Sequence, residues 1–448
     1  MTSTTSLSKI ILLLMCALLV FVMACASNQS STPSDERQPY QIAARTLVGS
    51  ALSTFYIDTN GCLWAWGEFS NTPLHIKTSV ASVYPLQSGF DGNRQPTLIY
   101  VIRRDDSLWQ LSGSHFTEHT HIMDSVASFC VSGIIICIDN NLWDFPANFH
   151  GRHTPDHIMD NVIFAQFRND RSPHRLAMFI IRTDNSLWAT DENSMRQLGY
   201  GTQTNRSELV HIMDNAVSVY TSTSGSIFAI QTDGSLWSWG VSARTGEDTH
   251  YVNPTPTLIM NNVASLYISQ LLGDSTFFAI KTDNSLWGWN TGYLKESFWE
   301  QEFCSVAGEM VYVYMHGYTS DSMLGNGIGK LHPYPVHIMD DIASIYTFGR
   351  QNRFALGTDG TLWSWGVNTA GIFGIGTQGD IHLTPTRVLY SVENFSLSTA
   401  RRNTANLTAT AILYNGNILV WGYNENGTLG DGTNTTRLSP HNITYRFN

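Results

Sequence analysis

Histidine recurs at similar positions along this chain of 448 residues, and imidazole nitrogen is a common ligand of metal ions. The recurring positions are His75, His121, His157, His211 and His337. A metal site needs several ligands that converge on one ion at about 2.0–2.2 Å. Equivalent positions in successive repeats point in symmetry-related directions, so these side chains do not converge. We therefore expect each histidine to be a strand or turn residue bonded to neighbouring backbone, and we predict no metal and no cofactor.

Aspartate recurs in a second short phrase, at Asp184, Asp233, Asp283 and Asp359. Each precedes an asparagine or a glycine, and such a pair is typical of a tight turn whose aspartate accepts hydrogen bonds from backbone amides. The chain has no aspartate-dense series like an EF-hand loop. The turn role is the predicted one, although the sequence leaves calcium binding at these loops open.

Motifs that assemble a catalytic site are absent from the sequence. It contains no Gly-x-Ser-x-Gly elbow, no phosphate-binding loop and no His-Glu-x-x-His zinc motif, and no pattern pairs two carboxylates as a glycosidase requires. We predict that the protein is not an enzyme. The alternative is a hydrolase or lyase that acts on cell-surface carbohydrate, because the absence of a motif is weak evidence against catalysis.

The elements that position these residues follow from an internal repeat. Residues 232–240 read Thr-Asp-Gly-Ser-Leu-Trp-Ser-Trp-Gly, and residues 358–366 repeat the phrase with one change. Eight such anchors occur, most of them roughly 45 to 56 residues apart, which is the length of one four-stranded propeller blade. The anchor tryptophans are Trp64, Trp109, Trp143, Trp188, Trp237, Trp287, Trp363 and Trp421. The sequence predicts an all-β propeller of seven or eight blades over residues 45–448.

One unit can be read strand by strand. Residues 228–232 form a short apolar strand, Asp233-Gly234 supplies the positive φ angles of a tight hairpin, and residues 236–239 form the returning strand. Two sets of tryptophans, two residues apart, lie on the same strand face. Both sets are predicted to be core, with the first set packed between blades.

Two anchor intervals depart from the repeat. The interval from Trp109 to Trp143 is short, so that unit has lost loop residues. The interval from Trp287 to Trp363 is long and contains residues 291–336, either an irregular insertion or a decayed repeat. Aromatic residues in an irregular loop favour a partner surface. The candidate binding residues are therefore Phe298, Trp299 and Tyr318.

The N-terminus carries features of export. Residues 1–24 hold one lysine before an apolar run and fit a secretory signal, and Val22-Met23-Ala24-Cys25 resembles the cleavage site of a bacterial lipoprotein. Cys25 is the expected lipidation site, and residues 25–44 form a polar tether. We expect a lipid-anchored protein on the extracytoplasmic face of the cell membrane. An uncleaved membrane anchor is the alternative.

Charge argues against a nucleic-acid partner. The formal net charge is −11, and removal of Lys9 with the signal would leave −12. Nucleic-acid binders carry a basic face, which this sequence lacks. Cys130 and Cys137 flank a Ser-Gly pair, so adjacent strands could bring them together as a disulfide, or leave them as two buried thiols.

The repeats resemble those of the regulator of chromosome condensation family. The resemblance rests on the Asp-Gly-x-Leu-Trp-x-Trp-Gly hairpin and on the glycine-rich loop that follows it in residues 196–202, 322–327, 368–377 and 424–433. It implies a propeller, usually of seven blades. The repeats run from a strand before Trp64 to a partial copy at His441-Asn442-Ile443, so we expect the C-terminal segment to complete the blade begun at the N-terminus. The resemblance also implies a binding or adaptor module that uses loops at one end of the ring. The expected partner is a protein or, alternatively, a cell-wall polymer, and we expect a monomer.

Overall fold

A computed structural model describes most of the predicted repeat domain. The described residues are 45–50, 53–67, 70–85, 98–130, 133–145, 154–167, 177–191, 193, 196–222, 225–241, 252–271, 274–291, 301–306, 309–314, 324–328, 332–348, 352–399 and 407–447. Across these residues the regular structure consists of antiparallel strands and three short 3-10 turns. The chain is therefore all-β, as its repeats predict.

The strands of the first four blades follow chain order. Blade 1 holds β1 (Thr46–Gly49), β2 (Ser53–Ile57), β3 (Leu63–Gly67) and β4 (Ser70–Lys77). Blade 2 holds β5 (Val80–Pro85), β6 (Ile99–Arg103), β7 (Leu108–Ser112) and β8 (Glu118–Met123), with η2 (Ser114–Phe116) between the last two. Blade 3 holds β9 (Val126–Cys130), β10 (Ile134–Cys137), β11 (Leu142–Asp144) and β12 (Asp156–Met159). Blade 4 holds β13 (Val162–Phe167), β14 (Met178–Arg182), β15 (Leu187–Asp191) and β16 (Arg206–Met213).

The other four blades repeat this order, with one addition. Blade 5 holds β17 (Ala216–Thr221), β18 (Ser226–Gln231), β19 (Leu236–Val241) and β20 (Val252–Met260). Blade 6 holds β21 (Val263–Leu271), β22 (Asp274–Lys281), β23 (Leu286–Thr291) and β26 (Val336–Met339), with the hairpin β24 (Gln301–Val306) and β25 (Glu309–Tyr314) between the last two. Blade 7 holds β27 (Ile342–Phe348), β28 (Asn352–Gly357), β29 (Leu362–Val367), η4 (Thr369–Gly371) and β30 (Ile381–Leu389). Blade 8 holds β31 (Val392–Thr399), β32 (Leu407–Leu413), β33 (Ile418–Gly422) and β34 (Arg437–Asn442), and η5 (Thr444–Phe447) follows it.

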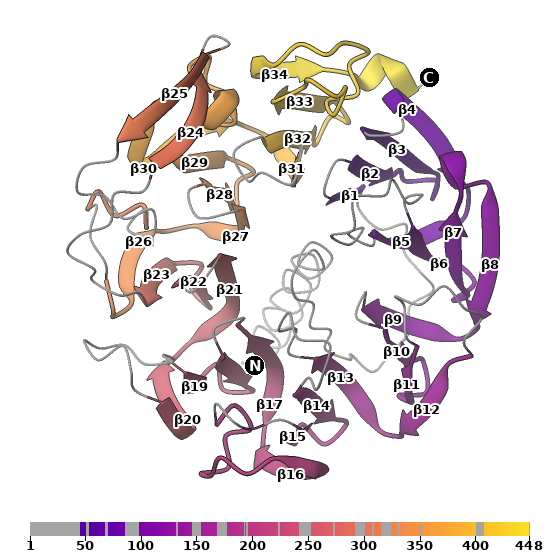
Figure 1. Cartoon of the computed structure of the whole chain (residues 1–448), viewed down its shortest axis with the longest axis vertical. Coiled ribbons are helices and arrows are strands. Elements are labelled where there is room, and N and C mark those ends of the chain that lie inside the picture. The colour runs from indigo at the N-terminus through magenta and orange to yellow at the C-terminus, as the bar shows by residue number, and fades with distance from the viewer. Residues whose placement is uncertain are drawn as a thin grey trace, which may run out of the picture.

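These blades form a ring around a central axis, with the first strand of each blade innermost (Figure 1). The described residues form eight four-stranded sheets, which settles the choice between seven and eight blades. The long interval before Trp363 comes from the β24–β25 hairpin, a separate two-stranded sheet, so residues 291–336 contain an insertion into blade 6. The short interval before Trp143 reflects two brief connections, from β7 to β8 and from β9 to β10.

Each hairpin between the second and third strands has one residue with positive φ. Gly234 has φ 79°, whereas Asp233 beside it is not among the positive-φ residues. The amide of Gly234 donates to the Gln231 carbonyl at 2.9 Å, and the Gln231 amide donates to the Ser235 carbonyl at 3.0 Å. This is a type I turn closed by a left-handed residue. The expectation of several positive φ angles was wrong, because only the last turn position needs one.

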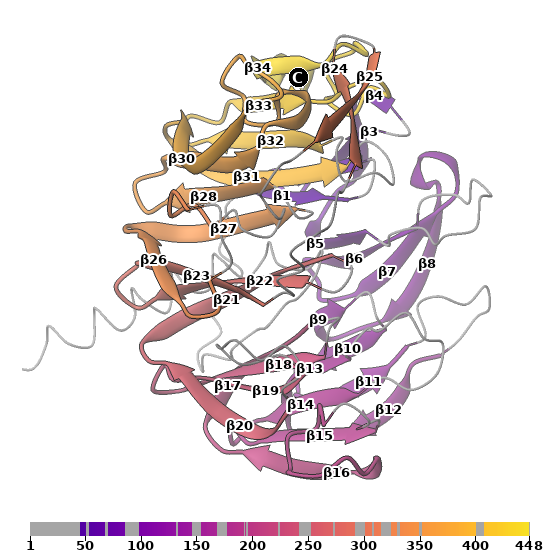
Figure 2. The ribbon, with the colours of Figure 1, turned by 60° about the vertical axis from the view of Figure 1, so that its left-hand side comes forward.

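Closure of the ring differs from the expected strand exchange. All four strands of blade 1 come from residues 46–77, and β34 stays in its own blade. β1 instead lies beside β31 of blade 8 (Figure 2). A Cβ on Gly49 would lie 1.8 Å from the Leu397 carbonyl oxygen, so the approach requires glycine. Phe447 of η5 packs edge-on against Trp66, with ring centroids 5.7 Å apart. The C-terminal segment thus reaches blade 1 through side-chain packing.

The core lies between neighbouring blades. The tryptophan at the second anchor position, which five of the eight anchors carry, is fully buried. One hydrophobic cluster joins Leu47, Trp66 and Ile443 across the seam between blades 8 and 1. The buried set consists of Trp66, Trp239, Trp289, Trp365 and Trp421. Its core role is confirmed. The first set is half-buried and lies opposite the outer strand of its own blade.

Candidate functional site

One face of the ring is built from short turns, and we call it the turn face. It contains the hairpins between second and third strands and the connections from each fourth strand to the next blade. Backbone bonds tie the two kinds of turn together. The Val263 amide donates to the Gly234 carbonyl and the Thr232 amide to the Asn215 carbonyl, both at 2.8 Å. These turns are therefore rigidly linked around the ring.

The repeated histidines belong to this face. His211 pairs across the strands with Trp188, with ring centroids 5.2 Å apart, and its Nε2 lies 2.9 Å from Asp214 Oδ1. The same arrangement recurs at His121–Asp124, His157–Asp160 and His337–Asp340, each at 2.8 Å. The predicted structural role holds, although the partner is a side chain rather than backbone. Within the described ranges, no three His, Cys, Asp or Glu residues form a group that could hold a metal ion.

The repeated aspartates close the hairpins. Asp233 Oδ1 accepts from the Ser235 amide at 2.8 Å and from Ser235 Oγ at 2.6 Å, and Trp237 Nε1 donates to that hydroxyl at 2.9 Å. Bonds from the Ser235 side chain and backbone lower the pKa of Asp233. Equivalent bonds occur at Asp184, Asp283 and Asp359. The turn role predicted for these carboxylates is confirmed.

The opposite face carries the connections from first to second and from third to fourth strands, and we call it the loop face. Three of its glycine-rich loops are organised around a buried asparagine. Asn193, Asn368 and Asn424 are each fully buried. Their Oδ1 atoms accept from the amides five residues ahead, at 2.8, 3.0 and 2.9 Å. Their Nδ2 groups donate across the loop, as Asn424 does to the Thr433 carbonyl at 3.0 Å.

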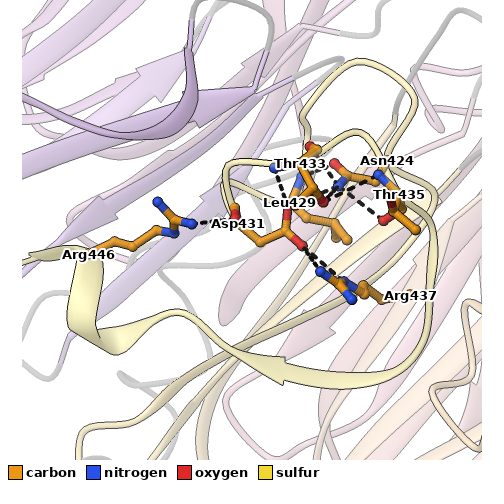
Figure 3. A network of polar contacts seen from close by, with 7 residues as sticks. All are labelled: Asn424, Leu429, Asp431, Thr433, Thr435, Arg437 and Arg446. Carbon is orange, nitrogen blue, oxygen red and sulfur yellow. Dashed lines mark hydrogen bonds and ion pairs between the residues drawn. The ribbon is translucent and has the colours of Figure 1, made fainter.

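The loop of blade 8 has the most extensive of these networks (Figure 3). The side chain of Asp431 is fully enclosed, and its Oδ2 lies 2.9 Å from both Nε and Nη2 of Arg437. Burial raises the pKa of Asp431, but hydrogen bonds from Thr433 and Arg437 outweigh burial and hold it below its usual value. Arg446 of η5 donates to the Asp431 carbonyl oxygen. The loop is thus connected to the segment that packs on blade 1.

A glycine of these loops packs on the buried tryptophan of the next blade. A Cβ on Gly199 would lie 2.6 Å from Trp239 Nε1, and one on Gly374 would lie 2.8 Å from Trp421 Nε1. The indole nitrogens donate to carbonyls of the same loops, from Trp239 to Gln197 at 2.8 Å and from Trp421 to Ile372 at 2.6 Å. The loop face is therefore supported by the core. The sequence contains a pattern that could have identified these asparagines, because each lies five residues before a buried leucine or phenylalanine.

The predicted binding residues Phe298, Trp299 and Tyr318 lie outside the described residues, and so does Cys25. Only the backbone of the neighbouring hairpin, β24–β25, is placed. No helix among the described residues is long and apolar enough to cross a membrane.

Cys130 and Cys137 lie on adjacent strands and are not joined by a disulfide. The register explains why they do not pair, since Cys130 faces Ile134 whereas Cys137 faces Val126 at the other end of the ladder. Burial and the nearby Asp139 raise the pKa of Cys137 to about 11.

Two carboxyls face each other at one place in blade 3. Asp144 and Asp156 are direct partners in the β11–β12 ladder, and burial together with Asp156 raises the pKa of Asp144. Glycosidases use such a combination, in which a carboxyl group with a raised pKa lies beside a second carboxyl group. This pair was not found from the sequence, because the two residues are separated by a connection of variable length.

No family model matches the chain. The ultraviolet-B receptor UVR8 of Arabidopsis thaliana is 28% identical over 134 residues, so the match spans 29% of this chain and 29% of the receptor. Among solved structures, yeast RCC1 (Prp20) bound to Kap60 is similar with a TM-score of 0.45 and 13% identity, covering 93% of this chain and 90% of that one. The BP39L lectin of Burkholderia pseudomallei gives a TM-score of 0.42 and 13% identity over 88% and 96% of the two chains.

The fold and its repeats define the class of this protein. It is an eight-bladed β-propeller, and its repeats resemble those of the regulator of chromosome condensation family.

Proposed function

We propose that this propeller is a protein-binding module that uses its loop face and is held outside the cytoplasmic membrane by an acylated Cys25. The observation that carries the proposal is the buried asparagine at the base of three glycine-rich loops, namely Asn193, Asn368 and Asn424. Loops that are ordered before binding lose little conformational entropy when a partner arrives. A rigid ring that presents such loops is typical of a binding scaffold.

The choice of face follows from the unequal loop lengths. The turn face repeats nearly the same short connections in every blade, whereas the loop face carries the long ones. The longest is the connection from β23 to β26, which contains the β24–β25 hairpin. Sequence variation concentrated on one face of a regular repeat is typical of its recognition surface. Phe298, Trp299 and Tyr318 belong to this connection and remain the proposed contact residues.

Membrane attachment rests on the sequence alone. In this proposal residues 1–24 act as the signal and residues 25–44 act as the tether. The propeller is a monomer, and its loop face is open to solvent. A Cys25→Ala variant of the full chain tests the anchor by acyl labelling and cell fractionation. We expect both the label and the membrane association to be lost. Equal membrane association of both proteins, without label in either, would remove the lipid anchor from the proposal.

The partner is tested by crosslinking the full-length chain on intact cells and identifying the captured proteins. In one variant a short Gly-Ser linker replaces residues 298–318, which leaves the packed segment at Leu324 in place. The matched control shortens residues 86–97, another loop of the same face. A protein captured by the parent and the control, and not by the first variant, is expected. Equal capture by all three would exclude this connection as the binding site.

A second candidate is the carbohydrate-degrading enzyme, and the facing pair Asp144 and Asp156 favours it. Release of reducing ends from purified cell-wall polysaccharide, lost in both Asp144→Asn and Asp156→Asn, would establish that activity. No release by the parent protein would leave binding as the function.

A further inference from the structure

Blade 7 departs from the repeat at the turn face. In blades 2, 3, 4 and 6 a histidine of the fourth strand lies opposite the first tryptophan and pairs with the aspartate three residues later. In blade 7 the residue opposite Trp363 is Arg387, and Tyr390 takes the place of the aspartate. The Arg387 guanidinium carbon lies 4.6 Å from the centre of the Tyr390 ring. A cation–π pair thus occupies the position of the ion pair in those four blades.

The adjacent turn of blade 8 departs from the repeat as well. Tyr414 occupies the hairpin position where blades 4, 5, 6 and 7 carry threonine, namely Thr183, Thr232, Thr282 and Thr358. Its amide donates to the Ser391 carbonyl at 2.9 Å, which places it beside the turn that holds Tyr390. A Cβ on Gly360 would lie 2.9 Å from Tyr414 Cε2, so the tyrosine ring rests directly on that glycine.

Both tyrosines are open to solvent. Tyr390 is 58% exposed and Tyr414 is 62% exposed, among the highest values for large apolar side chains in the described residues. The fold does not require tyrosine here, because four other blades use aspartate at the first position and four use threonine at the second. Tyrosine and arginine are the residues that most often dominate the energy of a protein interface. We call Arg387, Tyr390 and Tyr414 the seam patch.

The charges of the patch indicate the chemistry of its partner. Arg387 is exposed, and within the described part of the chain no carboxylate pairs with it. Nearby, Arg45 is already paired with Glu393 at 3.1 Å, and Asp359 is bonded to Thr361. The Arg387 guanidinium is therefore the group left to bind a carboxylate, and it is held in place by the Tyr390 ring.

We propose that the seam patch is a second interaction surface, which binds an acidic peptide segment of a partner protein. An Asp or Glu of that segment pairs with Arg387, and an adjacent apolar or aromatic side chain covers Tyr390 and Tyr414. The surface lies on the turn face, so it is independent of the loop-face function proposed above.

The test uses peptides selected from a displayed random library on the full-length protein, with affinities measured by fluorescence anisotropy. The variant Arg387→His/Tyr390→Asp/Tyr414→Thr restores the residues of the other blades and leaves the fold unstrained. We expect selected peptides to combine an acidic with an apolar residue, and to bind this variant about thirtyfold more weakly, as the loss of interface hot spots predicts. An Asp-to-Asn or Glu-to-Gln change in the peptide should weaken binding only to the parent.

A gain-of-function variant tests the proposal separately, because loss of binding in the restored variant could also result from unfolding. Leu258→Arg/Asn261→Tyr/Thr282→Tyr places the same three residues around Gly234, which is equivalent to Gly360. Binding of the selected peptide at this new position supports the proposal. Equal peptide affinity for the parent and the restored variant would overturn it. So would binding limited to neutral peptides, or to oligosaccharides on a glycan array run with both proteins.

Discussion

Gly430 of the last blade lies directly against the indole of Trp66 in the first blade. A Cβ on Gly430 would lie 2.6 Å from Trp66 Cδ1, and the same relationship joins Gly199 to Trp239 and Gly374 to Trp421. The seam between blades 8 and 1 therefore uses the contact that joins other neighbouring blades. The ring is closed by a repeated packing motif together with η5.

Gly430→Ala tests that contact. Gly430 has φ 68°, so alanine adds backbone strain as well as an overlap with Trp66, and we expect a loss of about 2–4 kcal/mol in the free energy of unfolding. The control is Gly379→Ala, because Gly379 has φ 81° but no atom within 4 Å of its Cβ position. Urea unfolding of both variants separates strain from packing. Equal losses would mean that the contact with Trp66 contributes nothing.

Asn424→Ala tests the asparagine that organises the loop of blade 8. The substitution leaves the Leu429 amide and the Thr433 carbonyl without a buried partner, and we expect a loss of about 2–3 kcal/mol. Asn415→Ala, in an exposed hairpin, removes one bond to the Asn417 amide and should cost about 0.5–1 kcal/mol. Thermal unfolding compares the two variants. An Asn424 variant as stable as the Asn415 variant would contradict the proposed preorganisation.

Acid should remove the contribution of Asp431. Because the folded pKa of Asp431 is lowered, its stabilising effect is present above the unfolded value of about 3.9 and is lost as the pH falls through the folded pKa. The stability difference between the parent and Asp431→Asn should therefore be large at neutral pH and should shrink below about pH 4. Urea titrations at several pH values measure it. A difference that grows with acid would have the wrong sign and would refute this role for Arg437.

The two cysteines of blade 3 should remain unpaired even in an oxidising buffer. The ladder register holds Cys130 and Cys137 at opposite ends of β9 and β10, and the raised pKa of Cys137 keeps its thiol protonated near neutral pH. Alkylation before and after unfolding, followed by mass spectrometry without reductant, should find both thiols, with Cys137 modified only after unfolding. A Cys130–Cys137 disulfide-linked peptide from native protein would disprove the register argument.

The hairpins could be predicted from the sequence because their signals are local. Asp233-Gly234 and its copies determine the turn, and Trp239 and its copies mark the core. Counting the eight anchors narrowed the number of blades to seven or eight, and the sheets of the structure settled it at eight. The closure was not predictable in this way. Whether β34 joins blade 1 or blade 8 depends on pairing between residues far apart in the chain, and nothing within Arg437–Asn442 distinguishes the two.

The proposed seam patch was not predicted from the sequence, for a related reason. The repeat marks the histidines, whereas the residues of the proposed patch depart from the repeat. Neither Arg387 nor Tyr414 belongs to a motif that the sequence alone identifies. Their meaning appears only when the register shows which repeated residues they replace, and when the Tyr414–Gly360 contact shows that neighbouring turns change together.

Every blade takes its four strands from one continuous stretch of chain. The pairing of strands within a blade therefore does not depend on the order of the blades along the chain. No sheet would be divided if the polypeptide were opened between β16 and β17 and its present ends were joined by a linker. Circular permutants cut at the short connections between blades would keep all eight sheets whole. Each blade is thus a complete pairing unit, so a change in the order of the blades would leave every strand with its present partners.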